Sequence, residues 1–108
     1  MDHEILSLDL NAHTLLVLSR QQVKEVLDWL RPEHPYHPDW GLRRDYGCDA
    51  VDMGYMLGII ETRLDRELGI WINLRRSLDV DACLNDDVDG LTGRLHHVLC
   101  NHFQLRRQ

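Results

Sequence analysis

Apolar residues recur at helical spacing in three separate stretches of the chain, and the first of these predicts a helix over residues 19–30. Ser19, with Gln22 three residues later, forms a capping-box pattern at its start. Pro32 predicts its end, because proline cannot continue a helix. The apolar face of this helix comprises Val23, Val26, Leu27 and Leu30.

The second predicted helix begins at Asp49, whose carboxylate can accept hydrogen bonds from the backbone N–H groups of the first turn. Asp52 follows at the third position, where a negative charge favours the positive end of the helix. Gly69 is a typical residue for its C-terminal end. One stripe at helical spacing, which we interpret as core, comprises Met53, Met56, Leu57, Ile60, Leu64 and Leu68.

The stretch between these helices, "RPEHPYHPDWG", holds all three prolines of the chain. This composition predicts a long irregular connection that runs along the surface. The first two helices are therefore not expected to form a tight hairpin.

A further helix is expected within residues 85–103, where an acidic start precedes apolar residues at helical spacing. The preceding segment is ambiguous: Ile70 and Ile72 alternate around Trp71 as in a short extended piece, and "RRSLDVDACL" is compatible with a short helix. In residues 1–18, "ILSLDL" alternates like a strand and "LLVL" is a short apolar run, so both an extra helix and an extended arm remain open.

Together these patterns predict an all-α protein, a small four-helix bundle with a long loop between its first two helices. We expect an N-terminal extension over 1–18, one helical domain over 19–103 and a tail over 104–108. The following residues should meet in a single core: Val26, Leu30, Met56, Ile60, Leu64, Leu95 and Leu99.

Composition narrows the possible functions. The formal net charge of −6, from 18 acidic and 12 basic residues, would repel a phosphate backbone, so nucleic acid is not an expected partner. No segment approaches the roughly 20 apolar residues needed to span a membrane, and the N-terminus lacks the features of a signal peptide. Three cysteines without a CxxC pair are typical of a reducing compartment, which predicts a cytoplasmic protein.

Histidine and cysteine offer two chemical hypotheses, a metal site and a nucleophilic enzyme. His34 and His37 lie in a loop, and His97 with Cys100 forms a single i, i+3 pair, so no zinc pattern results and no metal is expected. Cys48 lies just before a predicted helix N-terminus, which can activate a thiol. A small packed cysteine explains this position equally, no triad partner is identifiable, and we expect a shielded thiol and no catalytic residue.

The stretch "LRRDYGCDAVDMGYML", residues 42–57, resembles the acyl carrier proteins, in which an Asp-Leu-Gly-type loop leads into a helix that opens with Asp-Ser-Leu. "LDRELGIWI" and "DDVDGLTGRL" are similar to the end of the family's second helix and to its last helix, so the resemblance covers about residues 19–103. The positions that match the motif are Leu42, Asp45, Tyr46, Gly47, Asp49, Val51 and Asp52.

In such carriers 4'-phosphopantetheine hangs from a serine through a phosphodiester at a helix N-terminus, which favours a phosphate. The resemblance places Ala50 at the position of that serine, between Asp49 and Val51. Alanine has no hydroxyl, so the chain as written is expected to carry no cofactor there, and a serine at position 50 would restore the site. Ser77 in "RRSLD" imitates the motif without the preceding loop, and we interpret it as a decoy.

The resemblance implies partner proteins of fatty-acid, polyketide or peptide-type biosynthesis, or a phosphopantetheinyl transferase, that dock on the second helix. Helical geometry places one set of its residues opposite the core stripe. These are Val51, Tyr55, Ile59, Thr62 and Arg66, with Arg63 further along the same helix. Carriers generally present acidic residues on this helix, whereas Tyr55 and Ile59 occupy such positions here. We therefore expect a contact with partners, or self-association, that is more apolar and less salt-sensitive than the contact usual for the family. Alternatively, residues 1–18 fold back over this stripe.

Two other classes remain open. One is a helical interaction or regulatory module, in which Asp49 and Asp52 only cap a helix. The other is a small enzyme that depends on Cys48. The hypothesis of an acyl carrier leaves open whether Ala50 is native or replaces a serine.

Overall fold

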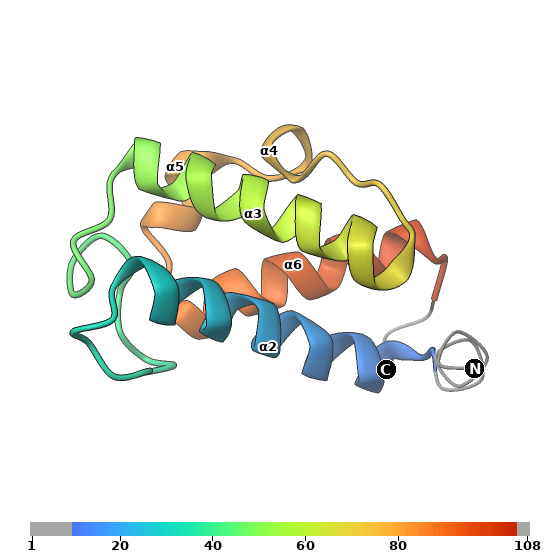
Figure 1. Cartoon of the computed structure of the whole chain (residues 1–108), viewed down its shortest axis with the longest axis horizontal. Helices are drawn as coiled ribbons and strands as arrows, with labels where there is room; N and C mark the ends of the chain where they lie inside the picture. Colours follow the sequence, from blue (N-terminus) through green and yellow to red (C-terminus); the bar gives the residue numbers. More distant parts are fainter. Residues whose placement is uncertain (1–9, 106–108) are drawn as a thin grey trace.

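The structure is a computed structural model that describes residues 10–105, and within them five helices are formed. Their bounds are α2 Ala12–Leu30, α3 Ala50–Leu68, α4 Leu74–Ser77, α5 Val80–Leu84 and α6 Val88–His102. In Figure 1 α2 and α3 run in opposite directions, α6 packs against α2, and the short helices α4 and α5 lie along α3. The expectation of an all-α protein is confirmed for the described residues.

Helix α2 begins seven residues earlier than the sequence pattern predicted. Asn11 is its N-cap: the Thr14 N–H donates to the Asn11 side chain at 3.0 Å, and the Asn11 N–H donates to Thr14 Oγ1 at 2.9 Å. Ser19 is buried in the interior of the helix, where its hydroxyl donates to the carbonyl of Leu15 at 2.7 Å. The predicted capping box at Ser19 is therefore wrong, and residues 12–18 extend α2.

Helix α3 has the predicted ends. Asp49 is the N-cap, and Gly69 ends the helix in the left-handed conformation, with φ 67°. Such a backbone favours glycine, because an L side chain is strained there.

Two short helices replace the one expected between α3 and α6. Leu78 and Asp79 separate α4 from α5 in an extended conformation, and Asp79 caps α5 by accepting from the N–H groups of its first turn. Residues 69–73 form no strand, so the extended piece suggested by Ile70 and Ile72 is not paired into a sheet. The expected four-helix bundle is corrected to five helices in the described part of the chain.

The core lies between α2, α3 and α6, as the apolar stripes predicted. Of the seven residues expected to converge, six are at most 2% exposed, and Leu30 is partly buried against them. Helix α2 packs most extensively on α6 and also contacts α3. The core prediction is confirmed in its main part.

The long loop crosses one end of the helices, where α2 ends and α3 begins (Figure 1). An isolated antiparallel bridge connects the loop to the start of α6. The Leu42 N–H donates to the Asp86 carbonyl at 3.0 Å, and the Val88 N–H donates to the Trp40 carbonyl at 2.9 Å. The surface course predicted for "HPYHPDW" holds for its prolines, while Tyr36 and Trp40 are half-buried against the core. The loop therefore reaches α3 from a fixed direction.

Candidate functional site

The segment that resembles the carriers, residues 42–57, includes the junction between the long loop and α3. Hydrogen bonds between side chains and the backbone fix this junction. The Asp52 N–H donates to Asp49 Oδ1 at 2.8 Å, and the Asp49 N–H donates to Asp52 Oδ2 at 3.1 Å. This reciprocal pair satisfies one backbone donor at the helix start and one at the cap. The first turn of α3 is fixed in the geometry that the sequence predicted from these two residues.

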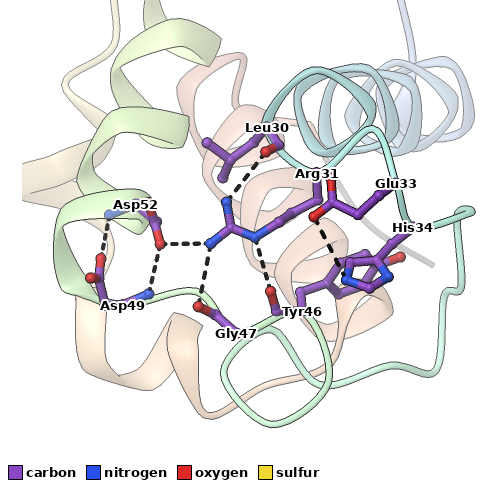
Figure 2. Close-up of polar contacts among 8 residues, drawn as sticks. All are labelled: Leu30, Arg31, Glu33, His34, Tyr46, Gly47, Asp49 and Asp52. Atoms are coloured by element: carbon purple, nitrogen blue, oxygen red, sulfur yellow. Dashed lines mark hydrogen bonds and ion pairs between the residues drawn. The ribbon is translucent and has the colours of Figure 1, made fainter.

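Arg31, the residue that follows α2, holds the loop against this turn (Figure 2). Its Nε donates to the carbonyl of Tyr46 at 3.0 Å, and its Nη2 donates to the carbonyl of Gly47 at 3.3 Å. Nη2 also lies 2.9 Å from Asp52 Oδ2 in an ion pair. Gly47 has φ 68°, a conformation that favours glycine. The Arg31 guanidinium thus links the end of α2, the loop and the first turn of α3.

Ala50 is the first residue of α3 and is exposed, directly after the capping Asp49. Val51, the next residue, is 79% exposed. The position that the carrier resemblance assigns to the attachment serine is thus accessible, and its side chain is a methyl group. The residues present do not fit a phosphodiester-linked prosthetic group, because position 50 has no oxygen to bond.

Two ionisable groups at the junction are perturbed in opposite directions. The hydrogen bond from the Asp49 backbone lowers the pKa of the Asp52 carboxyl, and Arg31 lowers it further. Burial raises the pKa of the Cys48 thiol, although Arg31 opposes this effect. Cys48 is buried, and its raised pKa disfavours the reactive thiolate form.

A shallow groove runs along the exposed face of α3 from Val51 to Arg66, bordered on one side by Arg75, and we call it the α3 groove. Its volume is about 620 Å³. Tyr55, which is 55% exposed, and the half-buried Ile59 both line it. The structure therefore brings together on one surface the residues that were predicted to face partners.

Trp29 of α2 extends this apolar surface beyond the groove. It is 59% exposed, and its ring lies 5.6 Å from that of Tyr55, between centroids. Exposed tryptophan and tyrosine side chains that touch each other leave a contiguous aromatic area in water. Sequence reasoning missed Trp29, although its position outside the stripe of Val23 and Val26 was a signal of exposure.

The arginines of the α3 groove differ in how they are held. Arg63 donates from Nε to Gln22 Oε1 at 2.7 Å and pairs with Glu25, so it joins α3 to α2. The Arg66 side chain is exposed and makes no hydrogen bond or ion pair with residues 10–105. Of these two residues, which were both predicted to contact partners, Arg66 has its charge available.

The other chemical candidates lie apart from this site. Ser77 is the last residue of α4 rather than the first of a helix, so its likeness to the attachment motif is limited to the sequence. His96 contacts Cys100, with its Nε2 3.3 Å from Sγ. Across residues 10–105, no three His, Cys, Asp or Glu side chains are grouped as a metal site would require.

None of the helices within residues 10–105 combines the length and the apolar character that a membrane-spanning segment needs. No family model, curated protein or solved structure matches the chain.

Proposed function

We propose that the chain is an acyl-carrier-like protein that presents α3 to partner proteins of fatty-acid, polyketide or peptide-type biosynthesis. In this proposal the chain is not itself an enzyme. It is also unable to carry 4'-phosphopantetheine at position 50 as written, whether Ala50 is native or replaces a serine.

The observation that carries the proposal is the setting of Ala50. It is exposed at the first position of a long helix, after an N-cap and after a Gly47-containing loop that Arg31 fixes in place. A helix N-terminus favours an attached phosphate, and a rigid loop would position it. The order of elements, with a long loop before α3 and short helices before α6, supports the same carrier-like arrangement.

The α3 groove favours a second candidate from another class, a helical interaction or regulatory module without any carrier role. Its exposed Val51 and Tyr55 form a contact surface that needs no prosthetic group. Both candidates assign protein binding to the same face of α3. They differ in whether position 50 belongs to a carrier site.

The test is to incubate Ala50→Ser with coenzyme A and a phosphopantetheinyl transferase of broad range, and to measure the intact mass. We expect Ala50→Ser to gain one pantetheine arm and the chain as written to gain none. Ala12→Ser is a matched control, because Ala12 is also the first residue of a long helix after an N-cap. A folded Ala50→Ser variant that stays unmodified would reject the carrier proposal and leave the interaction module.

A further inference from the structure

The α3 groove has a floor on which another backbone can approach closely. Gly54 and Gly58 lie one helical turn apart along it. A side-chain carbon added at Gly54 would meet no atom within 4 Å, and one added at Gly58 would meet only the Arg75 guanidinium at 3.9 Å. Larger residues would fit at both positions, so the glycines leave the groove open to an occupant.

The flanks of the groove are apolar at the end near Val51 and Tyr55, and basic near Arg66. The chain has 18 acidic and 12 basic residues, yet Arg63, Arg66 and Arg75 border the groove, and among residues 10–105 neither aspartate nor glutamate lines it. The main acids that pair Arg63 and Arg75 are Glu25 and Glu61, which lie outside the groove. The free charge of Arg66 therefore selects an anionic occupant.

From Val51 to Arg66 the groove follows about four turns of α3, roughly 22 Å at 1.5 Å per residue. A groove of this length along one helix, apolar at one end and basic at the other, matches a helix with apolar residues at i, i+3, i+4 and i+7, the pattern of helix-in-groove recognition. We infer that the α3 groove binds an amphipathic helix of a partner protein, with apolar anchors on Val51 and Tyr55 and acidic residues beside Arg66. This inference rests on the part of the proposed function that presents α3 to proteins, not on the chemistry at position 50.

The experiment is a display selection against the full chain, with a library of capped helical peptides of about 15 residues, which matches the length of the groove. Anchor positions at i, i+3, i+4 and i+7 carry leucine, and flanking positions carry glutamate or lysine in equal proportion. We expect selected peptides to be enriched in glutamate. The affinities of synthetic copies are then measured by fluorescence anisotropy for the chain and three variants.

Arg66→Glu should lower the affinity of the selected peptides about fivefold, because the attraction between residue 66 and the acidic peptide side chains becomes a repulsion at an exposed site. Tyr55→Glu should weaken them about tenfold or more, since it removes an aromatic contact. Arg20→Glu is the matched control: Arg20 is also exposed and has no ion pair within the described residues, and it lies outside the groove. Its effect should stay within about twofold. Circular dichroism verifies that each variant is folded.

Enrichment of lysine, no enriched peptide, or binding that neither Tyr55→Glu nor Arg66→Glu weakens would overturn the inference. Dimerisation of the chain that Tyr55→Glu abolishes, seen by analytical ultracentrifugation, would also overturn it and assign the groove to a second copy. The selection does not depend on residue 50. Peptide binding together with an unmodified Ala50→Ser would therefore keep the inference and reject the carrier proposal.

Discussion

The Arg31 guanidinium connects residues that are far apart in the chain: Tyr46 is 15 positions away and Asp52 is 21 positions away. Hydrogen bonds to charged groups contribute more than neutral ones, and here the same side chain fixes both the loop and the first turn of α3. The presentation of Ala50 thus depends on a residue that belongs to the end of another helix (Figure 2).

Asp52→Asn should lower the free energy of unfolding by about 1 kcal/mol at pH 7, because it weakens both the cap and the pair with Arg31. The pKa of Asp52 is lowered in the folded state, so its stabilisation is present above the unfolded pKa of about 3.9 and is lost as pH falls through the folded pKa. The difference between variant and parent should therefore shrink at pH 3.

Urea unfolding at pH 7 and pH 3 measures this effect. Asp65→Asn is the matched control on the same helix, since Asp65 is exposed and its side chain has no hydrogen bond or ion pair in the part of the chain that the structure describes. A difference between Asp52→Asn and its parent that stays constant with pH would contradict the assigned role of the carboxylate.

At the scale of single residues, the sequence predicted the roles of Asp49 and Asp52 at the start of α3, because a helix cap involves residues that are close together in the chain. It did not predict Arg31, because the contacts of this side chain depend on how the loop returns to α2. Short-range patterns contain no information about such a return.

At the scale of elements, the start of α2 shows how two local signals compete. Ser19 with Gln22 matched a capping box, but a serine inside a helix can also bond back to the carbonyl four residues before it, and Ser19 does so with Leu15. Asn11 and Thr14 form a reciprocal cap at the true start of α2. The apolar face of the helix therefore begins earlier and includes the buried Leu15. The earlier start was therefore present in the sequence as a second capping pattern.

Helix α4 has only four residues, and a buried acid holds its start. Glu61 of α3 accepts from the Leu74 N–H at 2.5 Å and from the Arg75 N–H at 3.2 Å, and it pairs with the Arg75 guanidinium at 3.2 Å. A carboxylate at a helix N-terminus satisfies backbone donors that would otherwise be unpaired. The position of Arg75 beside the α3 groove follows from this contact.

Glu61→Gln should lower the free energy of unfolding by about 2 kcal/mol, because an amide replaces one acceptor oxygen with a donor next to buried N–H groups. Amide hydrogen exchange at Leu74 should become faster than in the parent. Glu33→Gln, at an exposed loop position, is the control and should change neither quantity. Unchanged exchange at Leu74 would contradict the role given to Glu61.

At the scale of the whole molecule, helical periodicity was sufficient to predict an all-α protein, its core stripes and its long surface loop. Periodicity does not resolve helices of four or five residues, which is why α4 and α5 were expected as one element. Periodicity also predicted the outward face of α3 for four residues that are exposed, Val51, Tyr55, Thr62 and Arg66, whereas Ile59 is half-buried against the core. The contact between Trp29 and Tyr55 depends on how α2 packs against α3, which periodicity does not describe.

The charge of the α3 groove differs in sign from the net charge of the whole chain. The net charge of −6 describes the chain as a whole, whereas the part of the α3 groove formed by described residues contains arginines and no acids. An account of partners based on the average charge would predict basic partners for this face. The local arrangement predicts apolar and acidic ones.

The central claim is that partners recognise α3 beside position 50. The most direct measurement is the rate of phosphopantetheine transfer to Ala50→Ser in two backgrounds. Tyr55→Glu alters the α3 groove, whereas Trp71→Glu alters an aromatic residue of similar exposure, 69%, that does not line it. We predict that Tyr55→Glu slows transfer about tenfold, as loss of an aromatic interface contact would, while Trp71→Glu leaves the rate nearly unchanged. Equal rates in the two backgrounds would contradict the claim, whereas no transfer to Ala50→Ser at all would reject the carrier proposal.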